Sequence, residues 1–130
     1  MAKRVLDVGN CAADHRAIGI LLEREFGAAL TRAHGERDAL AALRAEHFDL
    51  VLVNRLFDRG GEGLAVISRI KKDPDLASIP VMLITDYAEF QHTAVEVGAA
   101  YGFGKAELRS DATREKLRHF LAGSEPKGTP

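Results

Sequence analysis

The chain has 130 residues, of which 46% are hydrophobic and 28% charged, and its formal net charge is -1. This length suits one domain with its own core, and the near-zero charge gives no overall attraction to nucleic acid. No apolar run approaches the roughly 20 residues of a membrane helix, so we expect no membrane partner. A single cysteine, Cys11, and a start without a signal-peptide pattern favour a cytoplasmic protein without disulfides.

Short apolar runs alternate with helical segments along the chain. The runs are typical of buried strands, and they cover residues 5–8, 28–33, 50–53, 81–84 and 99–103. Alternating strands and helices imply parallel strands joined by crossovers, with helices on both faces of the sheet. The pattern therefore predicts an α/β fold: a (βα)5 doubly wound parallel five-stranded sheet, with its functional crevice at the carboxyl ends of the strands.

The helical segments are indicated by apolar residues at helical spacing. The first stripe ends at Phe26, with Gly27 as a stop signal, and the last helix has Asp111 at its expected N-cap. The stripes are Ile18, Leu21, Leu22 and Phe26; Ala39, Leu40 and Leu43; Leu64, Ile67 and Ile70; residues 88–97 before Gly98; and Leu117, Phe120 and Leu121. We expect one domain over residues 1–122 and a disordered polar tail over residues 123–130.

Several stretches together resemble the receiver domains of response regulators, which are chemotaxis-receiver-like proteins of two-component signal transduction. The resemblance covers residues 3–122. It rests on residues 35–40 (GERDAL), 48–53 (FDLVLV), 63–64 (GL), 79–85 (IPVMLIT) and 98–99 (GA), with Lys105 seven residues after Gly98. It implies a flavodoxin-like sheet with strand order 2-1-3-4-5.

The resemblance also implies where a phosphorylation site would lie. The acidic pair that holds Mg²⁺ in the family falls on Gly9 and Asn10, and the phosphoacceptor aspartate falls on Asn54. The family's hydroxyl and lysine are present as Thr85 and Lys105. Three expected carboxylates are therefore missing together.

Other positions of the family's pattern also differ. Asp86 stands where a small residue is favoured, Gly102 stands at the aromatic switch position, and Ala106 replaces a proline. Mg²⁺ prefers carboxylate oxygens, and a carboxamide is a poor nucleophile. We therefore expect a pseudo-receiver without phosphorylation at Asn54, without a metal or cofactor, and without enzymatic activity.

Two alternatives remain open at this stage. One is phosphorylation at another acid, Asp58 or Asp86. The other is a small-ligand or anion-binding domain, in which Arg55, Arg59 and Lys105 could line the mouth of the crevice. A flavin or nucleotide site is weakly indicated, because residues 8–13 lack a glycine-rich fingerprint.

Three further side chains could replace or border the lost site. Asp7, inside the first strand, is expected to be a hydrogen-bonded structural aspartate. A second hypothesis joins Asp7 and Asp86 to Lys105 in a buried charge cluster that locks one conformation. Cys11 is expected to be a half-buried loop residue rather than a nucleophile.

The resemblance implies that protein partners meet the face formed by the fourth helix, the fifth strand and the fifth helix. The candidate residues on this face are Tyr87, Phe90, Gln91, Val95, Tyr101 and Phe103. Aromatic side chains often anchor interfaces. We expect a monomer or a weak homodimer that binds a protein partner.

Overall fold

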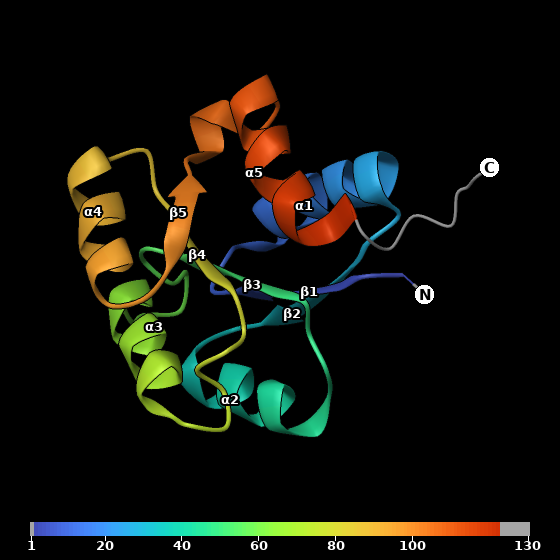
Figure 1. Cartoon of the computed structure of the whole chain (residues 1–130). Coiled ribbons are helices and arrows are strands. Elements are labelled where there is room, and N and C mark those ends of the chain that lie inside the picture. Colours follow the sequence, from blue (N-terminus) through green and yellow to red (C-terminus); the bar gives the residue numbers. More distant parts are fainter. Residues whose placement is uncertain (1, 123–130) are drawn as a thin grey trace.

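The computed structural model describes residues 2–122 (Figure 1). Strands and helices alternate throughout this part of the chain. The elements are β1 (Arg4–Val8), α1 (Ala12–Phe26), β2 (Ala29–Ala33), α2 (Glu36–Ala45), β3 (Leu50–Asn54), α3 (Gly63–Lys72), β4 (Val81–Ile84), α4 (Ala88–Glu96), β5 (Ala100–Phe103), the 3₁₀ helix η1 (Lys105–Glu107) and α5 (Asp111–Leu121).

The sheet has the predicted architecture. Its strands run in the order β2-β1-β3-β4-β5, and the neighbouring strands pair in parallel. The expected α/β fold and strand order are therefore confirmed. Parallel pairing brings the carboxyl ends of β1, β3, β4 and β5 to one edge, where the candidate site lies.

Two apolar layers hold the helices against the sheet. Along β3, Leu50 and Leu52 face the layer formed with α1 and α5, whereas Val51 and Val53 face the layer formed with α2, α3 and α4. Figure 1 shows α1 and α5 on one side of the sheet and α2 and α3 on the other. This alternation explains why the strands read as continuous apolar runs, since both faces are buried.

Helix ends follow local rules, with one correction. Gly27 takes the left-handed conformation (φ 64°) at the end of α1, as its position indicated. The N-cap of α5 is Ser110, whose hydroxyl accepts the N–H of Thr113 at 3.1 Å. The prediction of Asp111 was wrong by one residue, because the serine hydroxyl reaches the exposed N–H while Asp111 begins the helix itself.

The predicted tail, residues 123–130, lies outside the described residues. Within residues 2–122, no helix combines the length and apolar character needed to cross a membrane.

Candidate functional site

Asn54 ends β3 at the carboxyl edge of the sheet and is held there by its own side chain. Its amide nitrogen, Nδ2, donates to the carbonyl oxygen of Leu56 at 2.7 Å and lies 3.5 Å from the carbonyl oxygen of Gly9. Both neighbours are acceptors, so the N–H donors match this position. A carboxylate here would face carbonyl oxygens unless a cation or a donor came between them.

Gly9 packs against the ring of Phe57, a contact that the sequence did not indicate. Its φ is +85°, and a Cβ at this position would overlap the ring of Phe57, which is buried. The N–H of Asp58 also donates to the carbonyl oxygen of Gly9 at 3.1 Å. The loop after β3 therefore packs directly on the loop after β1, in a way that leaves no room for an acidic side chain at position 9.

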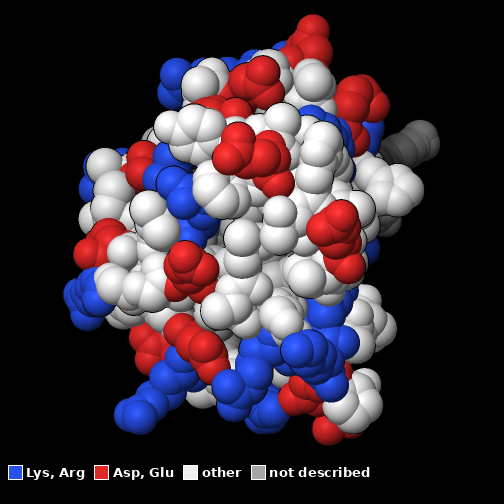
Figure 2. All heavy atoms as spheres, turned by 90° about the vertical axis from the view of Figure 1, so that its left-hand side faces the viewer, with Lys and Arg blue, Asp and Glu red and all other residues white. Residues whose placement is uncertain are grey.

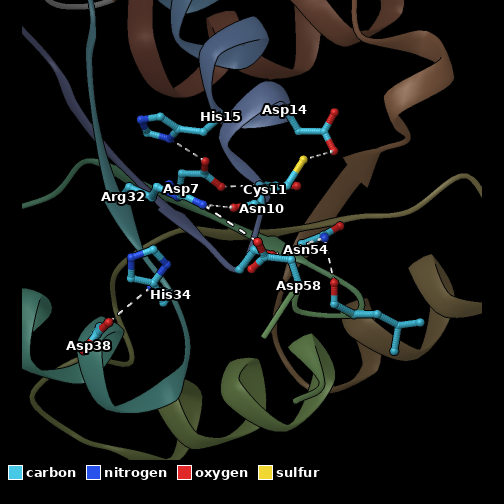
Figure 3. Close-up of polar contacts among 12 residues, drawn as sticks. Asp7, Asn10, Cys11, Asp14, His15, Arg32, His34, Asp38, Asn54 and Asp58 are labelled. Carbon is cyan, nitrogen blue, oxygen red and sulfur yellow. Dashed lines mark hydrogen bonds and ion pairs between the residues drawn. The ribbon is translucent and has the colours of Figure 1, made fainter. Parts of the chain in front are cut away.

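Asn10 is buried and faces Asp7. Its Nδ2 donates to Asp7 Oδ1 at 2.5 Å, and the Nδ1–H of His15, on α1, donates to Asp7 Oδ2 at 2.7 Å. Asp7 is fully buried, and each of its carboxylate oxygens has a hydrogen-bond partner, as buried polar groups require. The expectation of a structural, hydrogen-bonded Asp7 is confirmed, and Figure 3 shows Asn10 and His15 converging on it.

A guanidinium from β2 lies beside this cluster. Arg32 Nη2 donates to the carbonyl oxygen of Asn10 at 3.2 Å and lies 3.9 Å from Asp58 Oδ2, as Figure 3 shows. Asp58 is an exposed loop residue. A positive group thus already sits against the loop after β1, close to the position that the family's acidic pair would take.

The retained hydroxyl and lysine have partners within the chain. Thr85 Oγ1 accepts the N–H of Tyr87 at 3.2 Å, and Lys105 Nζ pairs with Asp14 Oδ2 at 2.7 Å. The Lys105 ammonium, as donor, holds the pKa of Asp14 below its usual range, despite partial burial of that carboxyl. Cys11 caps α1, is half-buried as expected, and donates its S–H to Asp14 at 3.4 Å.

Asp86 supports the backbone of the next loop. Its Oδ1 accepts the N–H of Ala106 at 3.2 Å, and a Cβ on Gly104 would overlap its carboxyl group. The proposed charge cluster of Asp7, Asp86 and Lys105 was wrong. In the described part of the chain, Asp7 pairs with His15 and Lys105 pairs with Asp14, both on α1. Asp86 bonds the backbone of Ala106 instead.

A shallow cavity of about 280 Å³ joins most of the candidate positions. It is lined by Asn54, Arg55, Leu56, Ile84, Thr85, Asp86, Tyr87 and Lys105. The structure thus brings Asn54, Thr85, Asp86 and Lys105 together in one cavity. The carbonyl oxygen of Gly9 lies next to the Asn54 amide. Arg55 and Lys105 reach this mouth as expected, whereas Arg59 is not among the lining residues.

The residues present do not fit a magnesium ion. The two amide nitrogens of Asn10 and Asn54 point at oxygen acceptors, and Gly9 has no side chain. Within residues 2–122, no three His, Cys, Asp or Glu side chains gather where they could hold a metal ion, and Asn10 Oδ1 is a buried side-chain oxygen without a partner. Mg²⁺ needs several hard oxygen ligands in near-octahedral geometry, and the described residues do not gather such a set.

The expected partner face is partly exposed and partly buried. Tyr87 and Tyr101 are 58% and 44% exposed, and Val95 is also exposed. Gln91 and Phe103, at 3% and 2%, are buried, so their placement on the face was wrong. Phe103 turns into the layer under α1 and α5, and Gln91 bonds the sheet backbone.

Aromatic and basic side chains on this face contact one another. The Arg55 guanidinium lies 4.3 Å from the ring centre of Phe90 and 5.7 Å from that of Tyr87. Tyr101 contacts His92 of α4 and Lys116 of α5, so it bridges the two helices. Figure 2 shows the side of the molecule carrying α3 and α4, where acidic side chains are scattered among uncharged ones over the middle and upper part and basic side chains gather below.

Solved structures of other proteins share the fold of this chain. A receiver domain of a DNA-binding response regulator from Colwellia psychrerythraea is 23% identical, with a TM-score of 0.79, and 90% of this chain and 96% of that one are covered. A putative response regulator from Chloroflexus aurantiacus is 18% identical, with a TM-score of 0.81 and coverages of 94% and 99%. The chemotaxis protein CheY4 of Vibrio cholerae is 17% identical, with a TM-score of 0.74 and coverages of 93% and 99%.

The chain has the receiver fold. No protein-family model matches its sequence, and no curated protein is similar to it in sequence.

Sequence reasoning missed three features of this site. The ring of Phe57 over Gly9, the Asp7–His15 pair and the three bonds of Gln91 all join residues from different elements. A large apolar residue in the polar loop after β3 was the one local signal that could have pointed to Phe57.

Proposed function

We propose that the chain is a signalling module of the two-component type that acts through protein contact and is not phosphorylated at Asn54. The observation that carries the proposal is the Asn54 amide, which donates toward the carbonyl oxygens of Leu56 and Gly9. These contacts use neutral N–H donors, so the site needs neither a metal ion nor a phosphoryl group to satisfy its polar atoms.

Phosphoryl transfer needs positive charge close to the transferred group. The two cations that line the cavity are already engaged, Lys105 with Asp14 and Arg55 with aromatic rings. Without a nucleophile or a metal site, the remaining hydroxyl of Thr85 has no reaction to assist. The module therefore has no catalytic residue in this proposal.

The partner surface in this proposal is the exposed part of the face between α4 and α5. Its exposed residues are Tyr87, Val95 and Tyr101, with the half-buried Phe90 beside Tyr87 and Lys116 at the edge. Exposed aromatic rings held by cations present rigid apolar area, which is the kind of surface that anchors protein contacts. We expect a protein partner with an apolar patch of its own.

The test is incubation of the protein with a small phosphodonor and Mg²⁺, followed by intact-mass measurement. We expect no gain of the roughly 80 Da that one phosphoryl group adds. A gain that vanishes in Asp58→Asn or Asp86→Asn would show instead an atypical receiver with another acceptor. Saturable binding of inorganic phosphate that Lys105→Met abolishes would favour the anion-binding alternative.

A further inference from the structure

The strands β4 and β5 do not pair in regular register. Met82 pairs with Ala100 and Ile84 with Phe103, so two steps along β4 correspond to three along β5. The extra residue of β5 lies between Ala100 and Phe103 and interrupts the regular ladder there. Buried backbone groups need hydrogen-bond partners from elsewhere when a ladder is interrupted.

A side chain from α4 fills this irregularity. Gln91 Nε2 donates to the carbonyl oxygens of Leu83 at 2.9 Å and Thr85 at 3.2 Å, and Gln91 Oε1 accepts the N–H of Gly102 at 2.8 Å. Both N–H donors and the oxygen of the carboxamide are used. One buried side chain therefore joins α4, the end of β4 and β5.

Gly102 is required for this arrangement. A Cβ at position 102 would overlap the carbonyl oxygen of Leu83. The close approach of β5 to β4 at this point, together with the bond to Gln91, explains why glycine stands at the position that the resemblance assigned to a switch aromatic.

We infer that Gln91 acts as a clamp that holds α4, β4 and β5 in one conformation. The proposed partner surface, which includes Tyr87 and Tyr101, is then presented permanently. Any shift of β5 relative to α4 breaks the Gly102 bond, and any shift of β4 breaks the other two. The three bonds share one carboxamide, so the positions of α4, β4 and β5 are coupled through a single buried side chain. This inference rests on the proposed function, because a permanently presented surface suits a module without a phosphoryl switch.

The test uses the ¹⁵N-labelled full chain and compares amide exchange and relaxation dispersion in the wild type, Gln91→Leu and Thr93→Ala. Thr93 is the matched control, since it lies on the exposed side of α4 and bonds only the carbonyl oxygen of Glu89 within its own helix. We expect flat dispersion profiles for residues 83–104 of the wild type. Gln91→Leu should speed exchange of the Gly102 amide by roughly 10- to 100-fold, because its acceptor is lost, and Thr93→Ala should change neither readout.

Gln91→Glu supplies a second variant in case leucine prevents folding. Its carboxylate keeps an acceptor for Gly102 and loses both donors, so dispersion should appear around residues 83–87. Millisecond exchange in the wild-type surface, or unchanged Gly102 protection in Gln91→Leu, would overturn the clamp. Neither measurement involves a phosphodonor, so failure of the clamp and failure of the proposed function give different results.

Discussion

The amide nitrogen of Asn54 donates to the carbonyl oxygen of Leu56, two residues further along the chain, at 2.7 Å. The same nitrogen lies 3.5 Å from the carbonyl oxygen of Gly9. Asn54 therefore ties the end of β3 to its own loop and approaches the loop after β1. Its amide performs a structural task at the position to which the resemblance assigns the phosphoacceptor.

Asn54→Asp should lower the stability of the protein. The new carboxylate oxygen would face carbonyl oxygens, and we expect a loss of about 1–3 kcal/mol in the free energy of unfolding, measured by urea titration at pH 7. Asn54→Ala is the control, since it removes the donor without adding charge and should cost about 1 kcal/mol.

Acid should reduce the difference between Asn54→Asp and the wild type. A protonated carboxyl group has an O–H that can donate to Leu56 in place of the amide. If Asn54→Asp proves as stable as the wild type at neutral pH, the amide does not hold the loop.

Gly9→Ala should be more costly than an alanine at another left-handed glycine. Gly9 and Gly60 both have positive φ, but a Cβ at Gly60 meets nothing within 4 Å, whereas one at Gly9 overlaps the Phe57 ring. We expect about 1–2 kcal/mol for Gly60→Ala from backbone strain alone, and about 1–3 kcal/mol more for Gly9→Ala from overpacking.

The ring overlap can be isolated by repeating both substitutions in a Phe57→Ala background. The excess cost of Gly9→Ala should then shrink, because the ring that it meets is gone. An excess that persists without the ring would mean that Phe57 does not determine glycine at position 9.

His15→Ala should destabilise the protein through Asp7. The buried carboxylate would lose one of its two partners, and we expect a loss of about 1–3 kcal/mol in thermal or urea unfolding. His119→Ala, an exposed site on α5, is the control. In a double-mutant cycle with Asp7→Asn, the two losses should not add, and simple additivity would show that the residues act separately.

The Lys105–Asp14 pair should make a small contribution that depends on pH. Because Lys105 lowers the pKa of Asp14 in the folded protein, the pair stabilises above the unfolded aspartate pKa of about 3.9. That contribution is lost as the pH falls through this value toward the folded pKa. Both side chains are more than a third exposed, so we expect only about 0.2–1 kcal/mol.

The measurement compares urea unfolding at pH 6 and pH 3 for the wild type, Asp14→Asn and the exposed control Asp75→Asn. Asp14→Asn should flatten the acid dependence slightly more than Asp75→Asn. An equal effect of the two substitutions would show that the pair contributes nothing in solution.

The parallel sheet could be predicted from the sequence because the strand and helix periodicities are local, whereas the strand order came from the resemblance to receiver domains. Leu50–Val53 alternates between two buried layers and is apolar throughout, and Gly27 marks a helix end by its own backbone conformation. The missing carboxylates at Gly9, Asn10 and Asn54 were likewise visible as single residues.

Contacts between distant elements could not be predicted in this way. Gln91 lies within the helical pattern of α4 and resembles a surface residue until the irregular pairing of β4 and β5 is known. Lys105 lies at the cavity as expected, but its partner Asp14, 91 positions away in the sequence, could not be predicted. Such partners depend on how crossovers place helices over the sheet, which no local pattern records.

We propose that the phosphoryl site is lost across the whole crevice and not at one residue. Intact-mass measurement of Asn54→Asp after incubation with a small phosphodonor and Mg²⁺ tests it most directly. We predict no added phosphoryl group of about 80 Da, because Gly9 and Asn10 still provide no carboxylate for the metal. A stoichiometric gain of that mass, dependent on Mg²⁺, would contradict the account.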